Sequence, residues 1–106
     1  TGKIYYDLLD RQQTEKRKDV AVVRLEQIYP MPETQMEALF KKYPNAQFCW
    51  VQEEPKNMGA WMHILRYDWA RGFKEITRKS SASPATGYAS VHKKEQETIV
   101  AEAFNV

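Results

Sequence analysis

The sequence predicts an α/β domain with a largely parallel sheet and helices on its faces. Apolar runs rich in β-branched and aromatic residues alternate along the chain with stretches in which apolar residues recur at helical spacing. Alternation of this kind is typical of βαβ crossovers, in which a helix joins two parallel strands. The polar residues at the ends of the apolar runs are then expected to lie where parallel sheets meet ligands and partners.

Three segments fit strands. Residues 20–29 (VAVVRLEQIY) begin with a β-branched apolar run, as expected of a strand buried on both faces, and Pro30 stops it. Residues 46–52 (AQFCWVQ) are the second predicted strand, and residues 75–79 (EITRK) are a short third one.

Four segments fit helices, each with one apolar face. The first covers residues 4–16, and the second starts at Pro32 and Glu33 and ends before Pro44. The third covers residues 57–73, with Asn57 as a plausible N-cap and Gly72 near its end. The last covers residues 90–105, after a loop of small residues, 80–88.

Composition and charge limit the classes of function that the chain could have. The chain has 106 residues, one small domain's worth, and 42% of them are apolar, which is ordinary for a globular protein. Its 16 basic and 14 acidic residues give a net charge of +2, which does not indicate a nucleic-acid binder. A single cysteine, Cys49, rules out an intrachain disulfide and fits a reducing compartment, and we expect it to be a small buried hydrophobe.

Charged residues end all three predicted strands. Glu26–Gln27, Glu53–Glu54 and Arg78–Ser80 should therefore meet at one edge of a parallel sheet. The alternative for Glu53 and Glu54 is that they are solvated, or that they pair with Lys56 or Arg66.

The start of the last helix is a candidate anion site. Its free backbone amides would be flanked by cationic and hydroxyl side chains, and helix N-termini of this kind bind phosphates. The residues are Ser90, His92, Lys93 and Lys94, with Arg78, Lys79, Ser80, Ser81 and Ser83 just before them. A solvated basic face is the alternative. No complete catalytic set is visible, and the two histidines, His63 and His92, lack neighbouring metal ligands.

Four stretches resemble, in order and spacing, the C-terminal portion of the E1 component of 2-oxoglutarate dehydrogenase. They are TGKIYYDLLD, VAVVRLEQIYPMP, YPNAQFCWVQEEPKNMGAW and SASPATGYASVHKKEQETIVAEAF. The segments QEEPKNMGAW and SASPATGY are specific to this family.

The resemblance implies a transketolase C-terminal-like domain over residues 1–106, as part of a larger multidomain chain. That fold is a three-layer α/β/α sandwich around a mixed, mostly parallel five-stranded sheet. The first two strands of the family sheet would be missing, so we expect an N-terminally truncated version of it, with Thr1, Gly2 and Lys3 following the last missing strand.

The resemblance also implies an activity for the whole enzyme. The family uses thiamin diphosphate and Mg²⁺ to decarboxylate 2-oxoglutarate and passes the succinyl group to a lipoyl group on the E2 succinyltransferase. The thiamin lies between the two preceding domains of a homodimer, so this region alone is expected to be inactive and to bind no cofactor. The compartment would be the cytoplasm in bacteria or the mitochondrial matrix in eukaryotes.

Site residues follow by position. Glu53, Glu54, Asn57 and Gly59 match the side of the domain that faces the rest of the dimer and the approach to the active site. A second group matches the region where acetyl-CoA or an adenine nucleotide such as AMP docks as an effector in some members: Arg78, Ser83, His92, Lys93 and Lys94. None of these residues is expected to be catalytic or to bind a metal.

Two other functions stay open. The chain could be a stand-alone nucleotide- or CoA-binding α/β module that uses the last loop and helix. It could also be an independent enzyme with Glu53 or Glu54 as general base, although no partner acid, nucleophile or metal ligand is evident.

Overall fold

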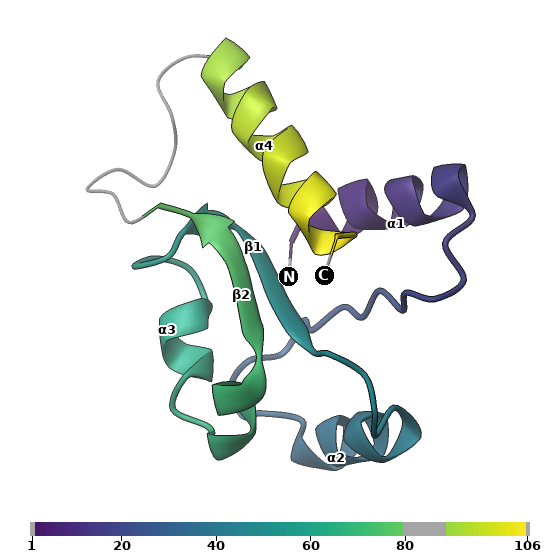
Figure 1. Ribbon diagram of the computed structural model, residues 1–106. Coiled ribbons are helices and arrows are strands. Elements are labelled where there is room, and N and C mark those ends of the chain that lie inside the picture. The colour runs from purple at the N-terminus through teal and green to yellow at the C-terminus, as the bar shows by residue number, and fades with distance from the viewer. Residues whose placement is uncertain (1, 80–88, 106) are drawn as a thin grey trace.

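The protein is a small α/β domain with a two-stranded parallel sheet (Figure 1). This computed structural model describes residues 2–79 and 89–105, with the backbone alone at 89–92. None of the helices within those residues has the length and apolar character to cross a membrane. In chain order the elements are α1 (Ile4–Glu15), α2 (Glu33–Lys42), β1 (Cys49–Pro55), α3 (Trp61–Ile64), the 3₁₀ helix η1 (Asp68–Gly72), β2 (Lys74–Arg78) and α4 (Ala89–Ala103).

The two strands run parallel and end at the same edge. Cys49 pairs with Lys74 and Val51 with Ile76, and after a shift in register Pro55 pairs with Arg78. The backbone N–H of Lys56 donates to the carbonyl of Arg78 at 2.8 Å, so pairing continues beyond the end of β1. The prediction of a shared edge is confirmed for the Glu53–Glu54 and Arg78 ends, whereas Glu26–Gln27 does not belong to a strand of the described sheet.

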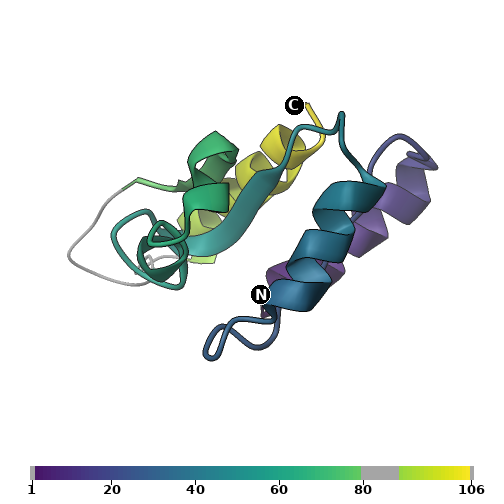
Figure 2. The ribbon, with the colours of Figure 1, turned by 90° about the horizontal axis from the view of Figure 1, so that it is seen from below.

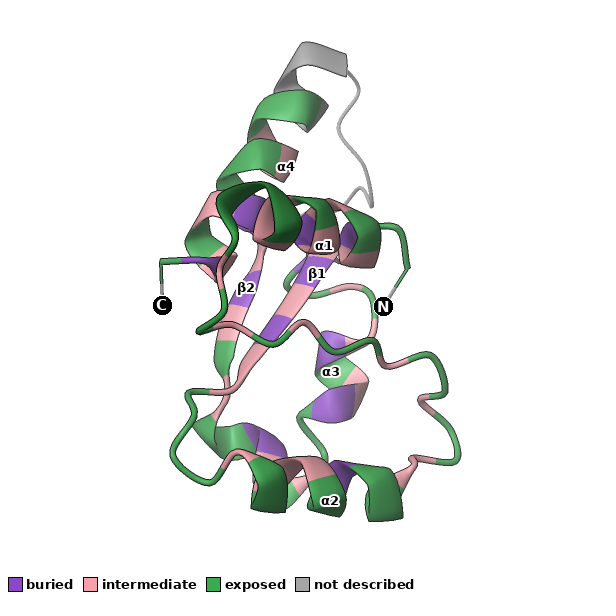
Figure 3. Cartoon of the chain, turned by 90° about the vertical axis from the view of Figure 1, so that its right-hand side faces the viewer, coloured by how far each residue is buried: buried purple, intermediate pink, exposed green. Residues whose placement is uncertain are grey.

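The sheet has a hydrophobic cluster on each face. Strand side chains alternate between faces, so Val51 contacts one cluster and Trp50 belongs to the other. The first cluster joins α1, β2 and α4 through Ile4, Leu8, Ile76, Ile99, Val100 and Phe104. The second joins β1 to α3 and η1 through Trp50, Trp61, Ile64 and Ala70. Figure 3 shows these buried positions on both strands, α1 and α3, whereas most of α2 is exposed.

Three of the four helix predictions are confirmed. Helices α1, α2 and α4 cover the predicted first, second and last helices to within two residues at each end. Ile4 is 1% exposed on α1, and burying such a side chain contributes about 1.5 to 3 kcal/mol. Their apolar faces therefore account for their positions in the fold.

The prediction of a paired strand over residues 20–29 is wrong. Within the described residues this segment makes no backbone–backbone hydrogen bond to another segment. Side chains hold it instead: Arg24 donates to Tyr6 at 2.8 Å and lies over its ring, and Gln12 donates to the carbonyl of Val20. The hydrogen bond to Tyr6 contributes most to raising the pKa of Arg24. A β-branched pattern predicts an extended backbone, but a strand also needs a neighbour to pair with.

The single helix predicted over residues 57–73 is also wrong. The chain forms two short helices, α3 and η1, separated by Tyr67 in an extended conformation (φ −94°, ψ 135°). Gly59 is left-handed (φ 68°), so no helix can start at Asn57 and run through it. Tyr67 stacks on Trp69 with ring centroids 5.5 Å apart, and this aromatic packing compensates for the break.

The second strand ends later than predicted. It runs from Cys49 to Pro55, so Glu53 and Glu54 are part of β1 and do not follow it. Pro55 is tolerated because it lies at the shift in register between the two strands. The prediction for the third strand is correct to within one residue at each end.

Candidate functional site

The amide of Gln52 organises the turn after β1. This side chain is 1% exposed, and its Oε1 accepts from Trp50 Nε1 at 2.9 Å and from the backbone N–H of Trp61 at 3.0 Å. Its Nε2 donates to the carbonyls of Pro55 at 2.9 Å and Met58 at 2.8 Å. The amide therefore accepts a hydrogen bond from a free backbone N–H at the start of α3, as an N-cap side chain would, although Gln52 belongs to a strand.

Gly59 lets this turn close against β1. A Cβ at residue 59 would lie 3.1 Å from Oε2 of Glu54 and 3.2 Å from Oε1 of Gln52. Its positive φ adds a conformational reason for glycine. The sequence QEEPKNMGAW thus forms one compact unit in which the strand end and the start of α3 are fastened together.

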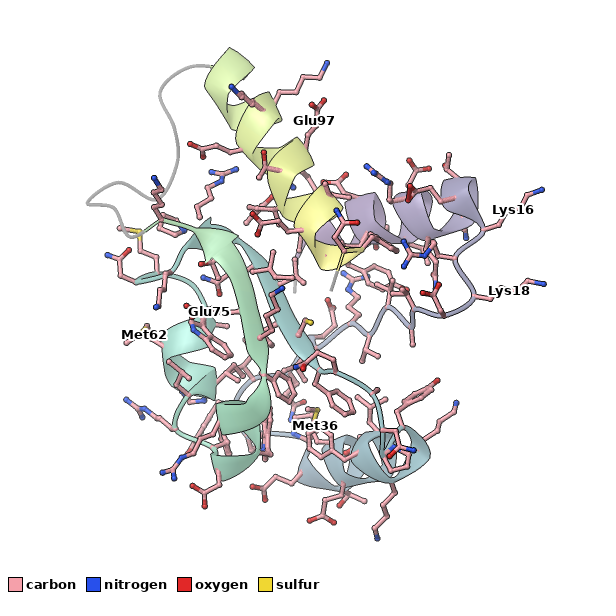
Figure 4. The ribbon with its side chains drawn as sticks, in the orientation of Figure 1. Lys16, Lys18, Met36, Met62, Glu75 and Glu97 are labelled. Atoms are coloured by element: carbon pink, nitrogen blue, oxygen red, sulfur yellow. The ribbon has the colours of Figure 1, made fainter. Side chains whose placement is uncertain are left out.

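Glu75 of β2 ties the same unit to the neighbouring strand. Its carboxylate accepts from Trp61 Nε1 at 2.5 Å and pairs with Lys56 Nζ at 2.7 Å. Figure 4 labels Glu75 beside α3, whereas Met62 of α3 points away from the sheet. Lys56 is half exposed, so the ion pair adds little stability, but it assigns Lys56 to Glu75 and not to Glu53 or Glu54.

Gln96 of α4 connects the two predicted parts of the site. Its Nε2 donates to Oδ2 of Asp7 at 2.9 Å and to Oε2 of Glu53 at 3.2 Å, and its Oε1 accepts from Nη2 of Arg78 at 3.3 Å. Glu53 and Arg78 were predicted from separate patterns. One amide now bridges them across α1, β1, β2 and α4.

Arg78 is the buried charge of this network. Its side chain is 7% exposed, and Nε lies 3.2 Å from Oε2 of Glu95. A buried guanidinium needs a carboxylate partner, because an isolated buried charge is costly. Arg78 therefore fixes α4 against the carboxyl ends of the strands.

The other predicted site residues are more exposed. Glu54 is half-buried beside Gly59, and Asn57, Lys93 and Lys94 are exposed. Ser83 lies outside the described residues, as do the side chains of Ser90 and His92. The structure therefore places Glu53 and Arg78 in one network and leaves the lysines on the open face of α4.

Sequence reasoning missed Gln52, Gln96 and Asp7. Two of them carry a sequence signal: Gln52 is a polar residue at the end of the apolar run 46–52, and Gln96 is spaced three and four residues before the apolar residues Ile99 and Val100. A polar side chain on an apolar helical face usually has a hydrogen-bonding role.

The side chains of this network form hydrogen bonds to one another. The residues that the structure describes contain no group of three or more His, Cys, Asp or Glu side chains placed to hold a metal ion. The contacts of Gln52, Gln96 and Arg78 go to other parts of the chain, and they join elements to each other. The network therefore joins the ends of β1 and β2 to α1 and α4.

Comparison with known proteins supplies the family. The family model described as "2-oxoglutarate dehydrogenase C-terminal" matches residues 1–104. The chain is 44% identical, over its whole length, to the "2-oxoglutarate dehydrogenase E1 component" of Azotobacter vinelandii, and 39% identical, again over its whole length, to the "Oxoglutarate dehydrogenase" of Buchnera aphidicola subsp. Baizongia pistaciae. It spans 12% of each of these relatives. It is also 42% identical, over 98% of its length, to the "Multifunctional 2-oxoglutarate metabolism enzyme" of Mycolicibacterium vanbaalenii, of which it spans 9%.

Proposed function

Because the chain belongs to the 2-oxoglutarate dehydrogenase C-terminal family, we propose that it works as the C-terminal region of an E1 enzyme that oxidatively decarboxylates 2-oxoglutarate. The observation that carries this proposal is the 44% identity, over the whole chain, to a protein named as an E1 component. The succinyl product would pass to the lipoyl group of an E2 succinyltransferase. The named relatives are bacterial, so we place the enzyme in the cytoplasm.

We assign thiamin diphosphate and Mg²⁺ to the rest of the enzyme. The described residues offer no cluster of metal ligands, and Glu53, Glu75 and Gln96 are engaged in the contacts above. They do not fit the cofactor.

The region's own task, in this proposal, is assembly. Glu53, Glu54, Asn57 and Gly59 would face the rest of the homodimer and border the approach to the active site. The rigidity of the turn held by Gln52 supports this role, because a docking edge keeps its shape only when its backbone groups are satisfied internally. The wider five-stranded, three-layer transketolase-like sheet is part of the same proposal.

The test is an assay of the intact E1 protein. We expect thiamin diphosphate-dependent turnover of 2-oxoglutarate, measured by ferricyanide reduction, and much weaker turnover of pyruvate. Residues 1–106 alone should show none. Equal activity with both 2-oxoacids, or activity without thiamin diphosphate, would contradict the proposal.

A regulatory site is a second proposal, favoured by the position of Arg78. Arg78 donates a hydrogen bond to Gln96 on α4, the helix that also carries Lys93 and Lys94. The cationic groups of β2 and α4 therefore lie in one region. Glu95 already pairs with Arg78, so the exposed lysines would contribute most to binding acetyl-CoA or AMP, with Ser83 and His92 as further contacts.

Calorimetry on intact E1 tests the regulatory site. The double variant Lys93→Ala/Lys94→Ala should weaken effector binding at least tenfold. The matched control is Lys41→Ala/Lys42→Ala, a pair of exposed neighbouring lysines at the end of α2, which should leave binding unchanged. No heat with either ligand on the unaltered protein would remove the regulatory site and leave the E1 assignment intact.

A further inference from the structure

The side chains of the adjacent acids Glu53 and Glu54 contact opposite sides of β1, as successive side chains of a strand do. Glu54 lies against Gly59, in the turn that leads to α3, whereas Glu53 accepts a hydrogen bond from Gln96 of α4. Both acids belong to the edge that is proposed above to face the rest of the homodimer. The two acids of this edge are therefore oriented by different elements, and for Glu53 that element is α4.

The amide of Gln96 supplies both donors and an acceptor at this position. Its Nε2 carries two N–H groups, which it donates to Oδ2 of Asp7 at 2.9 Å and to Oε2 of Glu53 at 3.2 Å. Its Oε1 accepts from Nη2 of Arg78 at 3.3 Å. These partners fix the orientation of the amide, because exchanging its oxygen and nitrogen would set the oxygen against two carboxylates and the nitrogen against a guanidinium.

Three carboxylates and one guanidinium meet in this network. Nε of Arg78 already lies 3.2 Å from Oε2 of Glu95, and Asp7 and Glu53 share the nitrogen of Gln96 as their donor. Two carboxylates that approach one donor repel each other when the donor is lost. The amide of Gln96 therefore holds the carboxylate of Glu53 beside that of Asp7.

The packing of α4 brings this amide to the ends of the strands. Ile99 and Val100, three and four residues after Gln96, are buried in the cluster that α4 shares with α1 and β2, so Gln96 lies on the same side of the helix. Glu97, the next residue, is exposed and points away from the strands (Figure 4). Seen from below, the two strands and α4 lie on one side of the molecule and α1 lies on the other (Figure 2), so the hydrogen bond to Asp7 joins the two sides.

We propose that Gln96 is the positioning residue of this edge. Its amide orients the carboxylate of Glu53, so the edge has the shape that docks only while α4 lies against the ends of the strands. Gln96 acts through Glu53 and does not itself contact the other subunit. The inference rests on the proposed function only for what the edge docks to.

Two substitutions in the intact E1 protein separate this role from simple anchoring of α4 to β2. Gln96→Lys keeps donors for Asp7 and Glu53 but loses the acceptor for Arg78, whereas Gln96→Glu keeps the acceptor and loses the donors. Lysine, glutamate and glutamine have similar helix propensities, so α4 itself should form in both variants. Gln13→Lys and Gln13→Glu, on the exposed side of α1, are the matched controls for the change of charge.

Hydrogen exchange at the backbone amides of Glu53, Glu54 and Lys56 reports on the end of β1. Gln96→Glu should speed this exchange about tenfold, as expected for the loss of one charge-assisted hydrogen bond, whereas Gln96→Lys and both controls should match the unaltered protein. Unchanged exchange in Gln96→Glu, or exchange in Gln96→Lys as fast as in Gln96→Glu, would overturn the inference. An equal effect of Gln13→Glu would also overturn it, because charge alone would then explain the change.

Analytical ultracentrifugation of the same variants tests the docking role separately. We expect the dissociation constant of the E1 dimer to rise about tenfold in Gln96→Glu and to stay unchanged in Gln96→Lys. The expected exchange without any weakening of the dimer would support the orientation of Glu53 by Gln96 and would overturn the docking role proposed for this edge.

Discussion

Gln52 Oε1 accepts a hydrogen bond from the backbone N–H of Trp61 at 3.0 Å, so a strand side chain caps the helix that follows. The same amide donates to carbonyls of the turn between them. The end of β1 and the start of α3 therefore form one hydrogen-bonded unit, and its stability should depend on this one side chain.

Replacing Gln52 with leucine should open that unit. Gln52→Leu leaves the N–H of Trp61 and the indole of Trp50 buried without their acceptor, at a cost of about 3 kcal/mol. This corresponds to about 100-fold faster hydrogen exchange at the Trp61 amide. Gln13→Leu on the exposed side of α1 is the control and should change nothing at Trp61. Equal exchange in both variants would show that the amide is dispensable.

Gly59 should resist substitution more than Gly2 or Gly72. Gly59→Ala combines strain at φ 68° with contacts of 3.1 to 3.2 Å to Glu54 and Gln52, and we expect a loss of about 2 kcal/mol. Two controls separate these causes. Gly2→Ala has the positive φ without a nearby atom, and Gly72→Ala has neither. Thermal unfolding should rank the losses in the order Gly59, Gly2, Gly72, and a loss at residue 72 as large as at residue 59 would refute the explanation.

Removing the charge of Arg78 should loosen α4. Arg78→Met deprives Gln96 and Glu95 of their partner on β2, and we expect a loss of about 2 kcal/mol, since Glu95 keeps access to water. Hydrogen exchange should rise in the C-terminal half of α4. Arg71→Met breaks a fully exposed pair with Asp68 and should have no measurable effect.

The thiol of Cys49 should react at higher pH than an ordinary cysteine. Burial raises the pKa of this thiol, and the nearby charge of Lys74 only partly opposes the effect. Alkylation by iodoacetamide should therefore reach half its maximal rate above pH 8.5, the usual pKa of a free cysteine. The pKa of this thiol is higher in the folded protein than in the unfolded protein. The contribution of Cys49 to the stability of the fold is therefore complete below the unfolded-state pKa and is lost as pH rises through the folded-state pKa. The urea-unfolded protein is the reference, and identical pH curves would contradict the prediction.

The sequence predicted most helices and the direction of the sheet, because those follow from local periodicity. Met36 at helical spacing and Ile76 in an apolar run are buried where the pattern places them. The edge shared by Glu53 and Arg78 followed from the rule that crossover connections make strands parallel.

The failures came where non-local partners decide the structure. Residues 20–29 have the composition of a strand, but pairing depends on what lies beside them. Gly59 divides a stretch whose apolar spacing fits one helix, because a turn closed by Gln52 outweighs helical propensity. Gln96 became part of the site because the fold brings α4 against both strands, which no local pattern shows.

Gln96 also decides how the two halves of the site can respond. It holds Asp7, Glu53 and Arg78 at once, over distances of 2.9 to 3.3 Å. All three contacts depend on the position of one side chain on α4. A ligand that shifted α4 by binding Lys93 and Lys94 would thus also alter the hydrogen bond between Gln96 and Glu53.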